Sequence, residues 1–458
     1  MEQQASLELQ EGSISKNLVS LAAPTILGYT FQMFYDLVDM MWIGRISAEA
    51  VAGVTIFTTM FWIVNVLNEI IGTSSISLIS QSYGRRDEDR TSLCVEQTLT
   101  FKALVAIIAM IIFSIILRPL LSFFTKDPVV SEAALSYGYI RVFFLPIMFS
   151  SYTVNTAFRC VGDAKKPMII MVIAAVLNII LDPILMFDVV PGTSIPGFGL
   201  GVFGAALATV ISITVTFIVG FAFILSNKTR VKIKVKRLFK LNLEIDKKLI
   251  TIGLPNGVEA LLRNLVGIFT LKFITYYGTE TVAAMGIGNR LIGFAFMPLL
   301  GLSMASSTIV GQSLGYENLK RAKATARTAT LFGSSLMMLV SIIVLIFPQH
   351  IMGIFISDSP EGIEIGKTMM RIIFPGLILA GVLMGHGSVF SGSGYNAPYL
   401  FASVAGRWCV QIPLMYIIVN MLKLQVEWVW VTFLIAEFVE VLVILYFYKQ
   451  GKWELNRV

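Results

Sequence analysis

The chain has 458 residues, of which 56% carry hydrophobic side chains and only 14% are charged, and its mean hydropathy is +0.79. Soluble globular proteins have about 25% charged residues, so this composition excludes a soluble fold and indicates a polytopic membrane protein. Three cysteines, Cys94, Cys160 and Cys409, are an odd number without CxxC spacing. This pattern predicts neither a disulfide framework nor a metal site.

Twelve apolar segments follow one another along the chain, each long enough to cross a hydrocarbon layer of roughly 30 Å at about 20 residues per helix. The residues before the first segment lack the basic region of a signal peptide, so we expect no cleavage there. The sequence therefore predicts an all-α protein with twelve transmembrane helices, at residues 17–43, 52–82, 94–117, 132–157, 167–187, 202–226, 248–276, 282–313, 325–347, 363–390, 398–420 and 426–448.

The net charge of +7 is distributed unevenly between the predicted loops. If the N-terminus is cytoplasmic, 23 basic residues lie in the inside segments and five lie outside. This positive-inside bias places both termini in the cytoplasm. It also explains the basic charge by topology and anionic lipid, so we expect the lipid bilayer as a partner and no nucleic acid.

A basic linker at residues 227–248 separates an N-lobe, residues 1–226, from a C-lobe, residues 249–458. A shift of 231 positions superimposes Pro24 on Pro255 and Gln81 on Gln312. Because each half has an even number of helices, the two six-helix bundles should be related by a pseudo-twofold axis along the membrane normal. This architecture is typical of alternating-access carriers, although a duplicated channel is an alternative. We expect the chain to act as a monomer.

The first predicted helix contains two aspartates in the stretch QMFYDLVDMMWIG. Gln32, Tyr35 and Asp39 are spaced i, i+3, i+7 and share one helical face, with Asp36 beside them. A carboxylate at bilayer depth costs a few kcal/mol even on lenient scales, so it normally faces a cavity or a partner. We therefore predict an ion or proton path at Asp39. A hydrogen bond to a neighbouring helix is the alternative for Asp39, and a helix contact is the alternative for Asp36.

The fifth predicted helix contains a second polar group in the stretch NIILDPILMF. Asn178 and Asp182 are spaced i, i+4, and Pro183 removes one backbone donor beside them. Together they form an oxygen-rich place that suits a hard cation or a proton. In the fourth helix Tyr137 and Asn155 are eighteen residues apart, or five helical turns, so we expect them to line one face.

The motif P-x7-Q-x2-Y-x3-D-x4-G in the first helix, QxxG after the second and N-x3-DP in the fifth resemble the multidrug and toxic compound extrusion (MATE) family, specifically its DinF-like branch. The resemblance implies a cation or proton site in the N-lobe and a substrate cavity beside it. It also implies a bending proline at Pro24. The implied ion site comprises Asp39, Asn178, Asp182 and Thr209, and the implied cavity is lined by Gln32, Tyr35, Tyr137 and Asn155. We add Asp36 to the predicted cavity residues because it lies beside Tyr35 on the same helix.

The resemblance implies a secondary active transporter of the cell membrane that exports amphiphilic or cationic compounds by antiport with H⁺ or Na⁺. Cargo and ion are expected to compete for one cavity, with no cofactor and no metal other than Na⁺. A lipid or lipid-linked oligosaccharide flippase of the same superfamily is the alternative; it would need Arg290, Arg371 and Arg407 along one groove. No protease or hydrolase motif indicates an enzyme. Glu259 and Arg263, spaced i, i+4, predict an ion pair that argues against a C-lobe cation site.

Overall fold

The structure is a computed structural model of the full chain and describes residues 9–226, 229–355 and 359–458. Residues 1–8 of the predicted N-lobe and residues 227–228 of the predicted linker lie outside the described residues. The described ranges contain helices but no strand, and a single isolated β-bridge joins Val189 to Pro196. The all-α class predicted from the sequence is confirmed.

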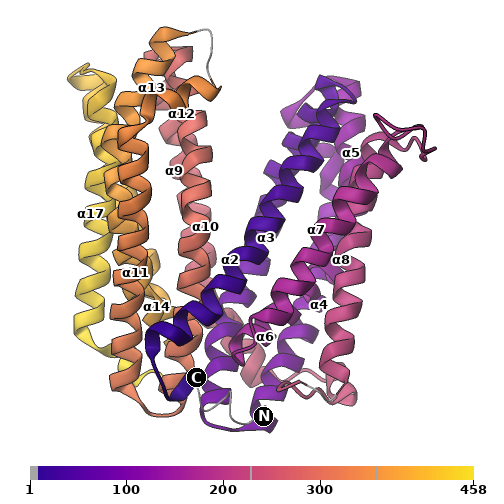
Figure 1. Cartoon of the computed structure of the whole chain (residues 1–458), viewed down its shortest axis with the longest axis vertical. Helices are drawn as coiled ribbons and strands as arrows, with labels where there is room; N and C mark the ends of the chain where they lie inside the picture. Colours follow the sequence, from indigo (N-terminus) through magenta and orange to yellow (C-terminus); the bar gives the residue numbers. More distant parts are fainter. Residues whose placement is uncertain (1–8, 227–228, 356–358) are drawn as a thin grey trace. The chain divides into compact units, whose positions relative to one another are not determined.

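The helices of the first half are α2 (Ile14–Gly44), α3 (Ala48–Gly84), α4 (Glu88–Phe124), α5 (Pro128–Phe143), α6 (Leu145–Cys160), α7 (Lys165–Met186) and α8 (Gly201–Leu225). Those of the second half are η1 (Val235–Phe239), α9 (Leu243–Ile274), η2 (Thr275–Tyr277), α10 (Thr279–Gly315), α11 (Leu319–Ile346), α12 (Pro348–Phe355), α13 (Pro360–Ile373), η3 (Phe374–Gly376), α14 (Leu377–Ser393), α15 (Ala397–Ser403), η4 (Val404–Gln411), α16 (Ile412–Tyr416), η5 (Ile417–Met421), α17 (Val426–Gln450) and α18 (Lys452–Leu455) (Figure 1).

By length and composition, nine helical segments of the described chain can each cross a membrane, and the bent pair α5 and α6 forms a tenth span. Helices α2 and α9 have 31 and 32 residues, more than the roughly 20 that a span requires. These segments together account for the twelve predicted spans. The chain is therefore a multi-pass membrane protein.

Two of the predicted spans contain interruptions that the apolar pattern does not indicate. Helices α5 and α6 meet at a 56° bend, because Pro146 near the start of α6 cannot continue the hydrogen bonding of the preceding helix. The span from Ala397 to Met421 contains two π-helical segments, η4 and η5. Such wide turns are rare and occur frequently at functional sites.

The described chain divides into two compact units whose boundaries fall inside helices. Of the described residues, the first unit contains 24–226 and 229–251, and the second contains 9–23, 252–355 and 359–458. The chain therefore passes from one unit to the other within α2, at Pro24, and again within α9, three residues before Pro255. The linker belongs to the first unit.

The start of each half is anchored in the same manner. In the second unit, Arg321 at the start of α11 donates from Nε to the carbonyl oxygen of Leu9 at 2.9 Å. In the first unit, Gln97 on α4 donates from Nε2 to the carbonyl oxygen of Lys240 at 2.8 Å. Leu9 and Lys240 are related by the 231-residue shift, and α4 and α11 begin at positions related by the same shift. The two halves therefore share backbone contacts as well as motifs.

The turns before α4 and α11 show the duplication in the backbone itself. Arg86 and Glu317, also related by the shift, both adopt left-handed backbone conformations, with φ values of 62° and 59°. Each is followed by an N-cap, Asp87 in the first half and Asn318 in the second, whose side-chain oxygen accepts a backbone N–H three residues later. Non-glycine residues rarely adopt positive φ, so this paired occurrence indicates a duplicated turn.

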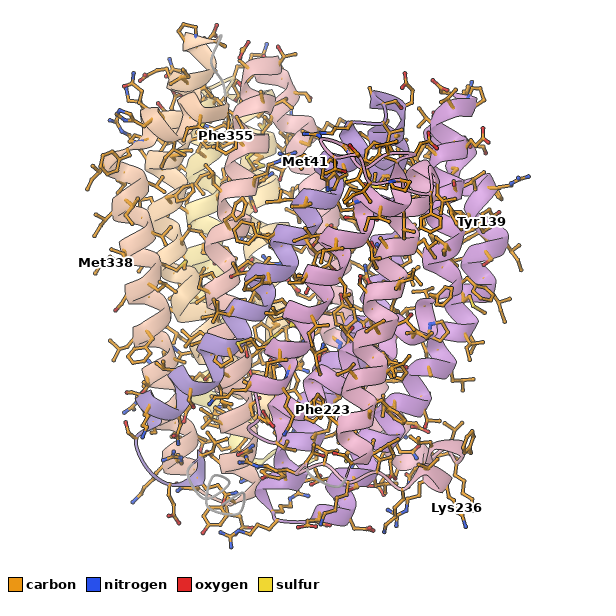
Figure 2. The ribbon with its side chains drawn as sticks, turned by 45° about the vertical axis from the view of Figure 1, so that its right-hand side comes forward. Met41, Tyr139, Phe223, Lys236, Met338 and Phe355 are labelled. Carbon is orange, nitrogen blue, oxygen red and sulfur yellow. The ribbon has the colours of Figure 1, made fainter. Side chains whose placement is uncertain are left out.

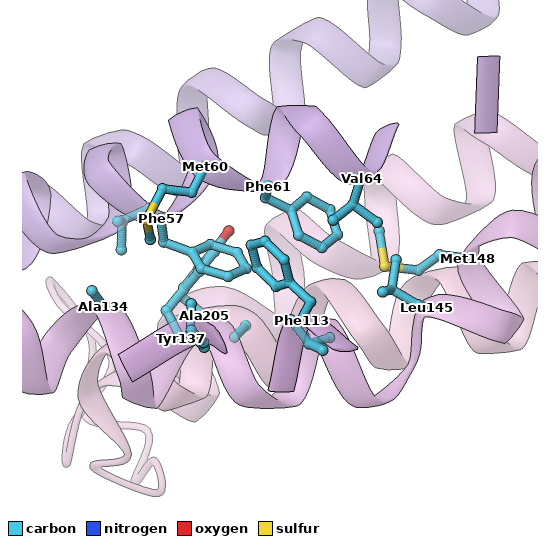
Figure 3. Packing of buried hydrophobic residues seen from close by; sticks show 14 of the residues in the cluster. Phe57, Met60, Phe61, Val64, Phe113, Ala134, Tyr137, Leu145, Met148 and Ala205 are labelled. Atoms are coloured by element: carbon cyan, nitrogen blue, oxygen red, sulfur yellow. The ribbon is translucent and has the colours of Figure 1, made fainter. Parts of the chain in front are cut away.

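The core of the first unit is built from aromatic rings between α3, α4 and α5 (Figure 3). Phe57 packs against Phe61 with ring centroids 5.1 Å apart and against the edge of Tyr137 at 5.7 Å. Phe61 also contacts Phe113 on α4 at 6.3 Å. This packing fixes the position of Tyr137, which contributes to the site described below.

The outer faces of the helices carry apolar side chains. Met338 projects from its helix in Figure 2, and both Met338 and Phe223 are exposed in the described structure. Exposed apolar surface along membrane-spanning helices is the surface that lipid covers. Lys236 lies on the basic linker, where charged side chains gather (Figure 2).

Close helix packing in the second unit makes Gly381→Ala a destabilising change. Helices α11 and α14 lie side by side (Figure 1). A Cβ at Gly381 would lie 2.5 Å from the backbone nitrogen of Ser334 on α11. We expect Gly381→Ala to cost about 1–3 kcal/mol through overpacking, measured as a lower thermal midpoint in detergent. Gly286→Ala on α10 is the control, because a Cβ there meets no described atom within 4 Å, and its midpoint should not fall.

Candidate functional site

Three of the four predicted ion-site residues meet through hydrogen bonds between α7 and α8. The Asn178 side-chain amide donates from Nδ2 to Asp182 Oδ1 at 3.2 Å and to Thr209 Oγ1 at 3.4 Å. The i, i+4 spacing places Asn178 and Asp182 on one face of α7, and all three side chains are buried. Thr209 Oγ1 also donates to the Ala205 carbonyl at 3.1 Å, which fixes its rotamer.

The fourth predicted residue, Asp39 on α2, is buried and lies close enough to Asp182 for their carboxylates to interact electrostatically. Tyr137 on α5 forms a side-chain hydrogen bond with Asp39. The Tyr137 hydroxyl accepts a hydrogen bond from Arg141 Nη1 at 3.1 Å, so its own proton can be donated to Asp39. Helices α2, α5, α7 and α8 therefore all contribute to one site.

Several oxygen atoms of this site have no hydrogen-bond donor within the described chain. They are Asp39 Oδ1, Asn178 Oδ1 and Asp182 Oδ2, each buried. A buried acceptor without a donor is costly, and two carboxylates beside an amide oxygen suit a hard cation or a proton. In the described ranges, no group of three or more His, Cys, Asp or Glu side chains could hold a metal ion. The donor set therefore fits a proton, or Na⁺ with carboxylate, amide and hydroxyl oxygens.

Arg141 is a member of this site that the sequence analysis did not identify. Its guanidinium lies 5.5 Å from the ring centroid of Tyr137 and 5.8 Å from that of Phe61. It also interacts electrostatically with Asp36 and Asp39. The available signal was a single basic residue inside an apolar segment, one turn after Tyr137. Arg141 supplies the positive charge that compensates the α2 carboxylates.

The predicted cavity residues divide into two groups. Gln32, Tyr35 and Asn155 line a small cavity of about 50 Å³ in the first unit. Tyr137 instead faces Asp39, and Asp36 is exposed but lies near Arg141. The expectation that Tyr137 and Asn155 share one continuous helical face is wrong, because the 56° bend between α5 and α6 separates them.

Lys102 is a second buried charge that sequence reasoning missed. It lies within α4, is 1% exposed and interacts electrostatically with Glu69 on α3. Its ammonium lies 6.0 Å from the ring centroid of Phe149. The sequence signal was a lysine within an otherwise apolar helix. The pair indicates that Glu69 belongs to a neutralised contact between helices.

The fold and the site together define a transporter: a duplicated, multi-pass helical protein with a buried carboxylate cluster in its first half. The model of the MatE family matches residues 24–184 and 255–417, which are corresponding parts of the two halves. The chain belongs to the MatE family of transporters.

Curated relatives match almost the whole chain. "Probable multidrug resistance protein YoeA" of Bacillus subtilis is 28% identical over 450 residues, which cover 97% of this chain and 96% of the relative. "Probable multidrug resistance protein NorM" of Thermotoga maritima is 24% identical, covering 97% of this chain and 94% of that protein. A solved MATE transporter in an outward-facing conformation has a TM-score of 0.90 and 23% identity, with 99% of both chains covered. A MOP superfamily transporter from Pyrococcus furiosus has a TM-score of 0.89 with the same identity and coverage. These similarities show the two-lobe fold.

Proposed function

We propose that this protein is a secondary active multidrug efflux transporter that exports amphiphilic or cationic small molecules by antiport with H⁺ or Na⁺. The observation that carries the proposal is the buried cluster of Asp39, Asn178, Asp182 and Thr209, in which one oxygen each of Asp39, Asn178 and Asp182 lacks a donor in the described chain. The names of the curated relatives, which describe multidrug resistance or export, support the cargo class. The assignment to the DinF-like branch is part of the proposal and rests on the sequence motifs.

The coupling step in this proposal is a change of charge at Asp39. A proton or Na⁺ that binds there neutralises the carboxylate and removes the electrostatic repulsion between Asp39 and Asp182. The free-energy cost of burying α2 against α7 then falls. Helix α2 bends at Pro24, where the two units divide. Gln32, Tyr35 and Asn155 form the wall along which cargo approaches the ion site. This mechanism uses no organic cofactor.

A flippase for lipid-linked pyrophosphates is less favoured. It requires free guanidinium groups, but Arg407 Nε already donates to Glu440 Oε1 at 2.7 Å and Arg407 Nη2 to Glu437 Oε2 at 2.5 Å. An arginine engaged by two carboxylates is a poor anion ligand. The family is a transporter family, which also disfavours an intramembrane enzyme.

The orientation and location follow from the charge distribution. We propose that the protein lies in the cell membrane as a monomer with both termini in the cytoplasm, because basic residues concentrate in the segments predicted to be inside. The lobes, residues 1–226 and 249–458, then provide alternating access. Lys234 and Arg237 of the linker bind Asp89 of α4 at 2.7 and 3.2 Å, which supports a linker held at the cytoplasmic end of the N-lobe.

Transport in proteoliposomes tests the proposal, with proton and sodium gradients imposed separately. An inward gradient of the coupling ion should drive ethidium efflux, and collapse of that gradient by a matching ionophore should stop it. Ethidium movement that proceeds at the same rate without either gradient would instead indicate a channel or a uniporter. Gradient-independent scrambling of a fluorescent lipid by the same preparation would support the flippase.

A further inference from the structure

A large cavity lies in the second unit. It has a volume of about 460 Å³ and is lined by α9, α10, α14, α17 and the π-helical segment η4. The first-unit cavity, lined by Gln32, Tyr35 and Asn155, measures about 50 Å³. Sites for drug-sized ligands usually measure about 300–1,000 Å³. The second-unit cavity falls within this range, whereas the first-unit cavity does not.

Sequence differences between the two halves explain why the second-unit cavity is larger than the first-unit cavity. The α9 wall of this cavity contains the residues that the 231-residue shift aligns with the polar face of α2. Tyr35 corresponds to Val266 and Asp36 to Gly267, so a ring and a carboxylate are absent from the second half. A Cβ built at Gly267 meets no described atom within 4 Å. The α9 wall of the cavity therefore carries smaller side chains at these two positions than α2 does.

A chain of five alternating charges crosses one side of the cavity. Glu259 accepts from Arg263 Nε at 2.6 Å, which confirms the predicted ion pair, and Arg263 Nη2 also lies 3.5 Å from Glu440 Oε2. Arg407 joins Glu440 to Glu437 through bonds of 2.7 and 2.5 Å. The pair of Glu259 and Arg263 is neutral by itself, which argued against a C-lobe cation site, but the whole chain of three carboxylates and two guanidiniums leaves one negative charge. Because Glu437 ends the chain and lines the cavity, the unbalanced charge favours a monocation there.

Gln411 adds a hydrogen-bond donor to the same cavity. Its side chain lines the cavity, is completely buried, and its Nε2 has no partner in the described chain. Gln411 Oε1 accepts from Arg407 Nη1 at 3.3 Å, so the amide orientation is fixed with Nε2 as the free group. A buried donor without an acceptor is costly, and an acceptor on a ligand would remove that cost.

Most of the other lining residues are apolar, although Thr270 and Asn289 are polar. The apolar ones include Ile292 and Phe296 of α10 and Phe433 and Leu434 of α17. Such walls bury the body of an amphiphilic ligand, while a few polar groups fix its orientation.

We propose that this C-lobe cavity is a second cargo site, which binds hydrophobic monocations that also bear a hydrogen-bond acceptor. The cation pairs with Glu437, the acceptor receives a hydrogen bond from Gln411 Nε2, and the apolar body packs on Phe296 and Phe433. The inference rests on the proposed efflux function and refines it. Cargo in this second site does not touch the Asp39 cluster, so cargo bound here does not compete directly with the coupling ion.

Binding of rhodamine 6G, a hydrophobic cation with an ester carbonyl, tests the proposal. Fluorescence polarisation measures its Kd for the full chain in detergent, without an ion gradient. Gly267→Leu should fill the cavity without a backbone clash and raise the Kd about tenfold or more. The matched control is Gly286→Leu on α10, where a Cβ also meets no described atom, and its Kd should stay within about twofold of wild type.

Two further variants complete the test. Glu437→Gln should also raise the Kd, whereas Glu364→Gln, which alters an exposed ion pair of the same unit, should leave it unchanged. Ala174→Phe fills the first-unit cavity instead. If Gly267→Leu binds rhodamine 6G with the wild-type Kd, the C-lobe site is overturned. This holds whether or not Ala174→Phe binds more weakly. Weaker binding in Gly267→Leu without gradient-driven efflux in the wild type would overturn antiport alone.

Discussion

Asp39→Asn should abolish ion-driven export while the protein remains folded. The asparagine side chain occupies the same volume and can still accept a hydrogen bond from Tyr137, but it can neither bind a proton nor pair with Na⁺. Without the charge change, the ion gradient no longer shifts the equilibrium between the two access states. We expect gradient-driven ethidium efflux to fall about 100-fold, equivalent to about 2.7 kcal/mol in the barrier.

The control for this experiment is Asp127→Asn in the same unit. Asp127 caps α5 through bonds to the backbone N–H groups of Val129 and Val130, and asparagine is an equally good N-cap. Efflux in Asp127→Asn should match wild type. Efflux in Asp39→Asn at the wild-type rate would refute the role assigned to Asp39, and identical thermal midpoints would exclude misfolding as the cause of any loss.

Arg407→Met should produce the largest loss of stability among single substitutions in the second unit. It leaves the carboxylates of Glu437 and Glu440 buried without their main partner, because both accept hydrogen bonds from the Arg407 guanidinium. Removal of one partner from a buried ion pair costs about 3–5 kcal/mol. The expected observation is a strongly lowered thermal midpoint, or loss of the monodisperse peak in fluorescence-detected gel filtration.

Two comparisons separate this effect from a general loss of charge. Lys367→Met breaks the exposed pair with Glu364, whose usual contribution is about 0–1 kcal/mol, so its midpoint should barely change. Adding Glu437→Gln to Arg407→Met should restore part of the stability, because one uncompensated carboxylate is removed. Equal midpoints for Arg407→Met and Lys367→Met would contradict the assignment of a structural ion-pair network.

The sequence predicted the parts of the site that depend on local geometry. Asn178 and Asp182 share a face because of their spacing, and the apolar length of each span determines that these residues lie within the membrane. Thr209 followed from the family resemblance, and the structure brings it into contact with Asn178. Whether these residues bind the coupling ion stays a prediction.

The sequence could not predict contacts that depend on helix direction and unfilled volume. Arg141 reaches the α2 carboxylates only because α5 ends at the bend beside Pro146. Likewise, the C-lobe cavity exists where Val266 and Gly267 fail to fill space, and the size of a void depends on every surrounding side chain. The predicted pair of Glu259 and Arg263 is present, but the continuation of that chain to Glu437 requires three helices to converge.

The anchoring of Leu9 by Arg321 and of Lys240 by Gln97 bears on the origin of the fold. In each half, the first segment belongs to the unit formed mainly by the other half, and the chain returns to its own unit inside α2 or α9. Two copies of a half-length ancestor with these contacts would form a domain-swapped homodimer. In that dimer, the first helical turns of each protomer would pack in the partner protomer. Fusion of the two genes would then have joined the protomers, so that contacts once made between two chains are now made within one.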